Sequence, residues 1–488
     1  MKNYFAIKTD KHSYLYIKDI KSKLIPIDNY TYDIINTYAN GQSISKLVEN
    51  NNNNTKYITA FNIFKMFQSY GFFESKKRPP FPSAIFTDND IRAVFSDIND
   101  IVFEVTDKCN LKCDYCAYGK FYTSYDKRES QMMSLEMAIQ TIDFVISESK
   151  KSFPNIHKKN ISIGFYGGEP LLNFKLIEKI VAYTKNKYPS IEFSYSMTTN
   201  GLLLANYINF LVENNFKIDV SLDGDSSNNG YRVFHDGSSS FKQVFKNIFY
   251  VKEKFPDYFN KKIGFLTVLH DKNSVEEIDT FFANNFDVSV FLSELSFLGI
   301  RDEMKSEFKL MFNSMFDEFS NINSCSNKKI SIKTVNEDPN LKSFLSEISY
   351  TSEYSFHNYN DIFFQKRKTM PTGTCLPFQK RLFVTVNGKY LSCESIGNKF
   401  VYGNVDKQGV HVNYVEIANS FNNYLSKFRK QCLNCYNREN CSDCMYNILD
   451  SNDKGICNNF MDYASHKEYI TTLISEMEKF NRKNLIKK

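Results

Sequence analysis

Between residues 95 and 320 the sequence alternates short apolar runs with segments of helical periodicity, and no other feature restricts the fold as strongly. The apolar runs are Ile101–Val105, Ile161–Phe165, Ile191–Met197, Ile218–Leu222, Lys262–Leu269 and Val288–Leu292. Strands that alternate with helices along a chain are typical of a parallel sheet covered by helices. Because six such units are too few to close an eight-fold barrel, the sequence predicts an α/β domain built as a partial (β/α)6 barrel.

The residues of greatest chemical interest follow the ends of the predicted strands. In chain order they are Cys109, Cys113, Cys116, Gly167, Gly168, Glu169, Asn200, Ser221, Asp223 and Arg232. Functional residues of such barrels lie at the carboxyl ends of strands, so we expect these side chains to gather at one end of the sheet. Taken singly, the Gly-Gly-Glu-Pro and Ser-Leu-Asp-Gly segments are also compatible with ordinary turns. Their joint placement after successive strands indicates a site.

The first motif, Cys109-Asn-Leu-Lys-Cys113-Asp-Tyr-Cys116, places three cysteines within eight residues. Three thiolates on a short loop can hold three irons of a [4Fe–4S] cube and leave the fourth iron without a protein ligand. A purely structural site would be expected to close its coordination shell. We therefore interpret this loop as an iron–sulfur site with one open position for chemistry.

A second group of seven cysteines occupies the C-terminal third of the chain. Its members are Cys375, Cys393, Cys432, Cys435, Cys441, Cys444 and Cys457. Leu382–Val386 and Lys389–Ser392, joined by Asn387-Gly388, are predicted to form a hairpin that brings the first two thiols near each other. The two CxxC pairs of this group are equally compatible with a zinc ribbon and with iron–sulfur ligation. The remaining cysteine, Cys325, is interpreted as an inert thiol.

Cysteine usage and charge also bear on the compartment and the partners. Ten of the eleven cysteines fall into these two groups, and the charged N-terminus lacks the apolar core of a signal peptide, which together favour a reducing cytoplasm. No run approaches the roughly 18 apolar residues of a membrane span. The net charge of +6 is mild for 488 residues and does not by itself indicate a nucleic-acid partner.

Residues 1–80 are predicted to form a small α+β unit with the outline of a winged helix. Three short strands are expected at Tyr4–Ile7, Tyr14–Ile17 and Lys23–Ile27, and helices at Thr31–Tyr38, Ser43–Val48 and 58–67. Winged helices usually bind DNA, but none of these predicted helices is a basic recognition helix. Farther on, residues 321–370 are expected to bridge two domains, and 466–488 to form an amphipathic helix that packs against the protein.

With these motifs in place, residues 95–320 resemble radical S-adenosylmethionine (SAM) enzymes, in which CxxxCxxC binds a [4Fe–4S] cluster and the methionyl group of SAM chelates the open iron. The resemblance implies that an electron from an external donor of the flavodoxin or ferredoxin type reduces the cluster. Cleavage of SAM then gives a 5′-deoxyadenosyl radical, which removes a hydrogen atom from an unactivated carbon. The protein orients the substrate and excludes water.

The same resemblance implies a surface that binds SAM. Its residues are Tyr115, Gly167, Gly168, Glu169, Asn200, Ser221, Asp223 and Arg232. The Gly-Gly-Glu segment would contact the methionyl amine, and Ser221 with Arg232 would bind the remaining methionyl or ribose groups. Tyr115 would pack near the adenine.

Residues 371–465 resemble the SPASM extension of radical enzymes, which carries two auxiliary [4Fe–4S] clusters, so three clusters are expected in all. The resemblance assigns Cys432, Cys435, Cys441 and Cys457 to one auxiliary cluster and Cys375, Cys393 and Cys444 to the other. The second cluster would keep an open iron for a substrate thiolate, or would take a ligand other than cysteine. Glu394 stands where related sulfatase-maturing enzymes have an acidic general base, and a surface carboxylate in a turn is the alternative.

Residues 1–80 resemble the recognition domain with which peptide-modifying enzymes hold the leader of a precursor peptide. In that family the leader adds as a strand to the edge that corresponds to Lys23–Ile27. Six Lys against three Asp in the first thirty residues would favour an acidic leader. Nucleic acid and membrane are not expected partners.

The whole chain therefore resembles a maturase of ribosomally made peptides. The leading hypothesis is a thioether bond between a substrate cysteine and a carbon of another residue. The alternatives are C–C or C–O cross-linking, epimerisation, and formylglycine formation as in sulfatase maturation. From a different class, a DNA-binding iron–sulfur redox sensor is also considered, although a sensor needs no cofactor pocket.

Overall fold

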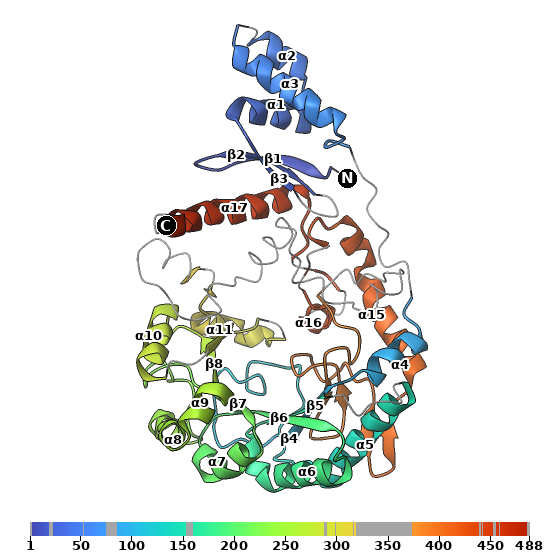
Figure 1. The fold of residues 1–488 in the computed structure, drawn as a ribbon, viewed down its shortest axis with the longest axis vertical. Coiled ribbons are helices and arrows are strands. Elements are labelled where there is room, and N and C mark those ends of the chain that lie inside the picture. The colour runs from blue at the N-terminus through green and yellow to red at the C-terminus, as the bar shows by residue number, and fades with distance from the viewer. Residues whose placement is uncertain are drawn as a thin grey trace.

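The computed structural model describes residues 2–18, 23–51, 53–74, 85–152, 160–286, 290–297, 299–315, 317–318, 373–438, 441, 443–451, 455–457 and 459–485. The expected bridging region 321–370, with Cys325, lies outside the described residues. Along the long axis, a small N-terminal unit rests on a C-terminal helix, and a large α/β body lies below them (Figure 1). Among the helices described, none is long and apolar enough to cross a membrane.

The N-terminal unit has the three strands and three helices that the sequence predicts. They are β1 (Tyr4–Lys8), β2 (Ser13–Ile17), β3 (Lys23–Ile27), α1 (Asn29–Ala39), α2 (Ile44–Glu49) and α3 (Thr55–Ser69). The antiparallel sheet has the order β1-β2-β3, so β3 lies at an edge. Side chains of β1 and β2 alternate between two cores, because successive residues of a strand face opposite sides. Tyr4 and Leu15 pack with α1 and α3, whereas Phe5 and Tyr16 pack on the C-terminal helix.

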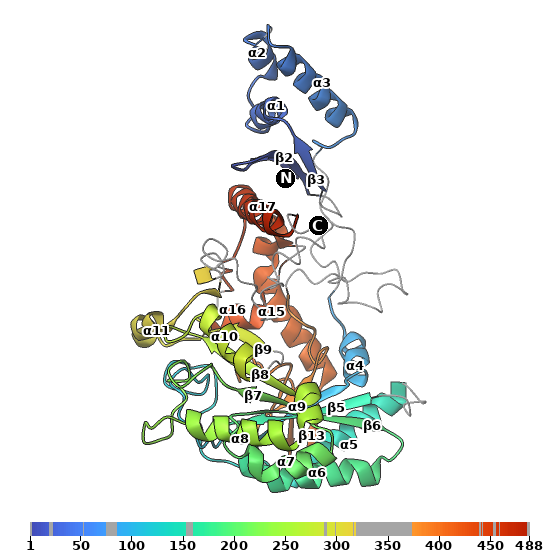
Figure 2. The same ribbon diagram turned by 60° about the vertical axis from the view of Figure 1, so that its left-hand side comes forward.

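The α/β body is built on a parallel sheet, which confirms the predicted fold class. Six neighbouring strands of this sheet are β4 (Asp100–Thr106), β5 (Asn160–Gly167), β6 (Glu192–Thr199), β7 (Lys217–Ser221), β8 (Ile263–Leu269) and β9 (Val290–Glu294). The crossover helices are α5 (Leu135–Ser152), α6 (Phe174–Lys187), α7 (Leu204–Glu213), α8 (Phe241–Lys254) and α10 (Val275–Asn285). Helices α5 to α8 line one side of the sheet (Figure 2).

The two faces of this sheet differ in chemistry. In β7, Ile218 and Val220 are fully buried in the core that contains the helices, whereas Asp219 and Ser221 face the other, partly exposed side. The neighbouring strand β8 repeats the pattern, with Phe265 in the core. The alternation of strand side chains therefore leaves hydroxyl and carboxyl groups on the inner face of the partial barrel.

The predicted C-terminal hairpin forms, but it belongs to the barrel sheet. Strands β10 (Leu382–Val384) and β11 (Tyr390–Leu391) give the sheet the order β11-β10-β4-β5-β6-β7-β8-β9, and β10 runs parallel to β4. Gly388 turns the hairpin with a φ of +79°, and a Cβ there would lie 2.1 Å from the Val405 carbonyl oxygen. The pairing covers the edge of β4, which would otherwise expose unpaired backbone groups. The expected unit 371–465 is thus joined to the barrel through one sheet.

The remaining elements lie outside this sheet. They are α4 (Asp88–Ser96), η2 (Pro170–Asn173), α9 (Pro256–Lys262), η3 (Asp302–Met304), α11 (Lys305–Met311), β12 (Asn404–Asp406), β13 (Gly409–His411), α15 (Tyr414–Asn434), α16 (Met445–Ser451) and α17 (Tyr463–Leu485). The last helix packs against the protein as expected, because Ile470, Leu473 and Ile474 are buried against the N-terminal sheet. The Tyr463 hydroxyl also donates to the Tyr4 carbonyl oxygen at 3.0 Å.

Candidate active site

The first three cysteines lie together on the loop that leaves the carboxyl end of β4. Backbone hydrogen bonds fix the loop to a later segment, from Lys112 N to the Val233 oxygen at 2.8 Å and from Asp114 N to the Tyr231 oxygen at 3.2 Å. Burial raises the pKa of the Cys113 thiol to about 12. The Arg232 guanidinium opposes this shift, and the Cys116 and Cys109 thiols contribute to it. A thiol in this setting ionises when a metal replaces its proton.

The surroundings of these thiols fit an iron–sulfur cluster. N–H donors point at the sulfur atoms, from Leu111 N to Cys109 Sγ at 3.4 Å and from Arg128 Nη2 to Cys116 Sγ at 3.5 Å. Hydrogen bonds to sulfur are among the means by which proteins hold and tune such clusters. Among the residues described, no three His, Cys, Asp or Glu side chains converge on a single metal ion. In a cube, by contrast, each thiolate binds a different iron.

The Gly-Gly-Glu segment at the end of β5 packs directly on the base of the cysteine loop. A Cβ on Gly168 would lie 2.2 Å from the Lys108 carbonyl oxygen, so only glycine fits there. Glu169 N donates to that same oxygen at 2.9 Å. The segment therefore brings the Glu169 carboxylate against the loop of the three cysteines, as the strand-end rule predicts.

Glu169 is completely buried and accepts three hydrogen bonds. The donors are Thr199 Oγ1 at 2.7 Å, Asn200 N at 2.8 Å and Leu171 N at 3.1 Å. Burial raises the pKa of Glu169 to about 7, although these hydrogen bonds oppose the shift. A neighbouring ammonium group would favour the ionised form of this carboxyl, so the setting suits a cationic ligand.

The side chain of Asn200, a residue predicted to bind SAM, contacts the cysteine loop. Its Nδ2 lies 2.7 Å from Asn110 Oδ1 and 3.8 Å from Cys109 Sγ. Its Oδ1 accepts from Leu202 N at 3.0 Å. The side chain thus joins the end of β6 to the cysteine loop.

Asp223 and Arg232, both predicted to bind SAM, bind each other. Arg232 Nε and Nη2 lie 2.9 and 3.0 Å from the two Asp223 oxygens. Asp223 also accepts from Val268 N at 3.0 Å and from the Tyr115 hydroxyl. Burial alone would raise the pKa of Asp223, but the Arg232 guanidinium and the hydrogen bonds hold it at about 2. Ser221 is the last residue of β7 and pairs with Leu266 of β8.

The sequence did not predict one member of this network, His270. His270 Nε2 lies 3.6 Å from Asp223 Oδ2, and its ring stacks on Tyr115 at 5.8 Å between centroids. His270 follows β8 directly. Applying the strand-end rule to the fifth strand as well as to the first four would have identified it.

Four of the seven C-terminal cysteines lie near one another in the structure. Cys432 at the end of α15 has Cys441, Cys435 and Cys457 as electrostatic neighbours. Burial raises the pKa of Cys432 and of Cys441 to about 12. These four thiols are the set that the resemblance to the SPASM extension assigns to one cluster.

Of the other three thiols, Cys375 and Cys444 are electrostatic neighbours. Thr374, beside Cys375, accepts from Met445 N at 2.7 Å and so links the two segments. Cys393 lies just after the hairpin, and its Sγ is 3.4 Å from Glu394 Oε2. Burial raises the pKa of Cys393 to about 11, and the Glu394 charge adds to the shift.

Glu394 lies in an ion-pair network and not in a freely exposed turn. Arg381 Nη1 lies 2.7 Å from Glu394 Oε1, and Arg381 Nε lies 3.1 Å from Asp100 Oδ2 on β4. The Glu394 side chain is 26% exposed. Its carboxylate thus lies beside the Cys393 thiol and is held there by Arg381.

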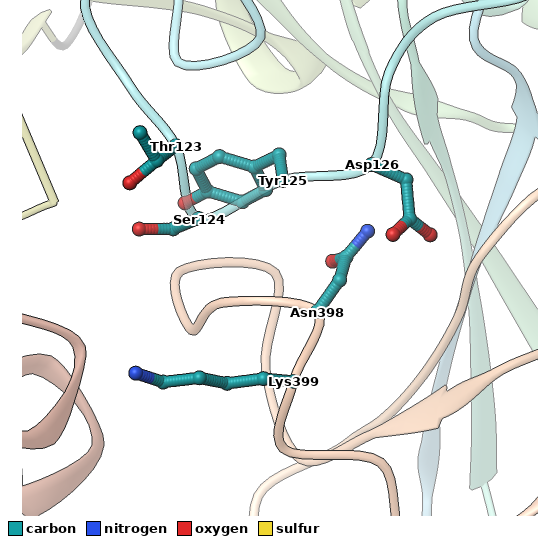
Figure 3. A pocket seen from close by; sticks show the side chains of 6 residues that line it. All are labelled: Thr123, Ser124, Tyr125, Asp126, Asn398 and Lys399. Atoms are coloured by element: carbon teal, nitrogen blue, oxygen red, sulfur yellow. The ribbon is translucent and has the colours of Figure 1, made fainter. Parts of the chain in front are cut away.

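A cavity of about 330 Å³ lies between the chain segments that follow Cys116 and Cys393 (Figure 3). Its lining residues are Thr123, Ser124, Tyr125, Asp126, Asn398 and Lys399. Asn398 N donates to the Ser124 oxygen at 2.8 Å, which holds the two segments together. Ser124 Oγ is buried and has no hydrogen-bond partner among the residues described. The side chains of Ser124, Thr123 and Lys399 extend toward the same side of the cavity (Figure 3).

Comparison with known proteins agrees with this site. The Radical SAM superfamily model matches residues 103–283. The chain is 26% identical to the radical SAM cyclopropyl synthase TigE of Paramaledivibacter caminithermalis, over 93% of this chain and 92% of that protein. A cysteine-type anaerobic sulfatase-maturating enzyme of Clostridium novyi is 29% identical over 184 residues, which is 37% of this chain and 45% of that enzyme.

A solved structure shares the fold. The structure of native anSMEcpe with bound AdoMet and Cp18Cys peptide has a TM-score of 0.51 and 20% identity, and the similarity covers 80% of this chain and 99% of that one. Enzymes with a radical SAM domain use a [4Fe–4S] cluster and SAM, which agrees with the three thiols after β4. Residues 103–283 form a radical SAM domain, and the protein is an enzyme.

Proposed function

We propose that this enzyme modifies a precursor peptide by radical chemistry, with the peptide held between its two cysteine systems. The observation that carries the proposal is the position of the cavity lined by Thr123–Asp126 and by Asn398 and Lys399. One wall follows the cysteine loop of the radical domain, and the other follows Cys393. Tyr166 has Glu394, Cys116 and Tyr125 as electrostatic neighbours, so a substrate beside Tyr125 would lie near residues of both cysteine systems.

The residues around the first cysteine loop would hold the cofactors. Cys109, Cys113 and Cys116 would bind a [4Fe–4S] cluster, and Glu169 would receive the ammonium group of SAM. SAM bound to a reduced cluster supplies a 5′-deoxyadenosyl radical. The Asp223–Arg232 pair keeps its own charges neutralised within the site. It would therefore act by fixing the site wall and Tyr115.

Two auxiliary clusters would complete the enzyme. Four thiolates would enclose one cluster, those of Cys432, Cys435, Cys441 and Cys457. Cys375, Cys393 and Cys444 would hold the second and leave one iron open for a substrate thiolate. Glu394, held by Arg381 beside Cys393, would accept the proton of that thiol.

The edge strand β3 would bind the leader of the precursor. Pro26 of β3 pairs with Tyr14 and has no N–H. A proline on an edge strand turns its nitrogen away from the neighbouring strand, so Leu24, two residues away, also turns its N–H outward. A leader strand would hydrogen-bond there, and Lys23 at the start of β3 would favour an acidic leader.

Substituting Leu24→Pro tests this assignment, because it removes the outward N–H and leaves the pairing with β2 intact. Leu24→Ala is the matched control, since it truncates the side chain and keeps the N–H. We expect Leu24→Pro to weaken binding of the leader about tenfold, the worth of one strand hydrogen bond. Fluorescence anisotropy of a labelled leader, from a precursor encoded beside the enzyme, measures the affinity. Equal affinities of the two variants would reject β3 as the docking strand.

For the bond itself we retain the thioether as the leading candidate, and one observation favours a second. The similarity to a cyclopropyl synthase extends over 93% of the chain, which supports carbon–carbon bond formation. The match to the sulfatase-maturating enzyme covers only 37% and supports formylglycine formation less. A thioether consumes a substrate thiol and a carbon–carbon bond leaves it free, so the two products can be told apart chemically.

A further inference from the structure

Arg128 is a half-buried cation beside the first cysteine loop, and its Nε atom is fully buried. The proposed function gives this charge no role. Its Nη2 lies 3.5 Å from Cys116 Sγ. Its guanidinium carbon lies 4.3 Å from the centre of the Tyr118 ring, in the geometry of a cation–π contact. The side chain therefore contacts a cluster cysteine on one side and an aromatic ring on the other.

The segment that carries Arg128 is fixed to the strand that carries the cysteines. Asp107, at the end of β4, accepts from Glu129 N at 2.8 Å and from Gln131 N at 2.6 Å. Thr106 Oγ1 donates to the Gln131 oxygen at 2.6 Å. Because β4 holds both segments, the distance from the guanidinium to the thiol is set by the fold.

The charge of Arg128 is not neutralised as directly as the charges of Arg232 and Arg381. Arg232 and Arg381 bind carboxylate oxygens at 2.9 and 2.7 Å. Arg128 Nε is buried without a hydrogen-bond partner among the residues described. Glu104 is its charged neighbour, and that carboxylate accepts from Val386 N at 2.9 Å. Positive charge therefore remains available to the cysteine loop.

We propose that Arg128 is a positioning residue that raises the reduction potential of the cluster bound by Cys109, Cys113 and Cys116. On reduction the cluster takes up one electron, and thus one negative charge, from a one-electron donor, and no covalent bond forms or breaks. A nearby cation and an N–H···S hydrogen bond stabilise the more negative state. The inference rests on the assignment of this cluster and is independent of the identity of the peptide or of the bond formed.

Redox titration of the full-length reconstituted protein with dithionite, followed by electron paramagnetic resonance, tests the proposal. The signal that changes when SAM is added identifies the relevant cluster. At the midpoint reduction potential of the wild type, we expect the ratio of reduced to oxidised cluster to be about tenfold lower in Arg128→Gln. For a one-electron couple this corresponds to a midpoint potential that is about 59 mV lower. Arg128→Lys keeps the charge and should stay closer to the wild type.

Arg92 offers a matched control, because its guanidinium also stacks on a tyrosine, Tyr414, at 4.3 Å and binds Glu148 at 3.4 Å. Arg92→Gln should leave the potential unchanged. An unchanged potential in Arg128→Gln, or an equal shift in both Gln variants, would overturn the proposal. If Arg128→Gln assembles no cluster, Arg128→Met, which keeps an apolar chain over Tyr118, replaces it. Loss of the cluster in both neutral variants would show that Arg128 has a structural role, and this would also overturn the proposal. None of these results would count against the proposed modification of a peptide.

Discussion

We expect that replacing Cys109, Cys113 and Cys116 together by Ala abolishes 5′-deoxyadenosine formation and leaves the C-terminal clusters in place. The three thiolates would be the only protein ligands of the cluster that binds SAM, so their loss removes the electron source for cleavage. Chromatography of reactions containing SAM and dithionite measures the nucleoside. The wild type should hold about twelve irons, three cubes of four, and the triple variant about eight.

The matched control replaces Cys435, Cys441 and Cys457 by Ala, which removes the same number of thiols from the C-terminal group. That variant should still form 5′-deoxyadenosine, because the first loop is untouched. Persistence of 5′-deoxyadenosine in the first triple variant would refute the role of the loop. A wild type with about four irons and stoichiometric zinc would refute the two auxiliary clusters and favour the zinc ribbon.

The Asp223→Asn substitution should destabilise the fold by roughly 3–5 kcal/mol, because it leaves the buried Arg232 guanidinium without its counter-charge. The folded-state pKa of Asp223, about 2, lies below its ordinary value of 3.8. A carboxyl with a lowered pKa stabilises the fold above its unfolded pKa, and this stabilisation is lost as the pH falls from about 4 to about 2. The variant should therefore show its full deficit at pH 7 and a smaller deficit near pH 2.

Urea unfolding at pH 7 measures this effect. Asp225→Asn is the control, since that carboxyl lies two residues away, is largely exposed and accepts its hydrogen bonds from Ser227 and Asn228. We expect the control to cost less than about 1 kcal/mol. If Asp223→Asn cost no more than the control, the pair would not be a buried structural unit.

Much of this fold follows from local pattern. The predicted strand Ile101–Val105 lies within the observed Asp100–Thr106, and Lys23–Ile27 is the same in both. Alternation and turn residues act over a few positions, so they define strands and the hairpin turn at Gly388. The joining of β10 to β4 could not be predicted, because the paired residues Leu382 and Ile101 are far apart in the chain and no local pattern specifies their pairing.

The candidate site, like the fold, could be predicted only in part from the sequence. The strand-end rule brought Glu169 and the cysteine loop together, because parallel strands end at one edge of a sheet. It did not reveal that Asp223 binds Arg232, since side-chain pairing depends on how loops fold over the strand ends. Arg128 belongs to no motif, and only the anchoring of its segment to β4 brings it to Cys116.

Mass spectrometry of a precursor peptide encoded beside this enzyme, after anaerobic co-expression and alkylation of free thiols, tests the central claim most directly. We predict that the peptide loses two hydrogen atoms for each bond formed and that each thioether removes one alkylatable thiol. Loss of two hydrogens with every thiol still alkylated would favour a carbon–carbon bond instead. A precursor that returns unmodified in every residue, from enzyme with a full complement of iron, would contradict the account.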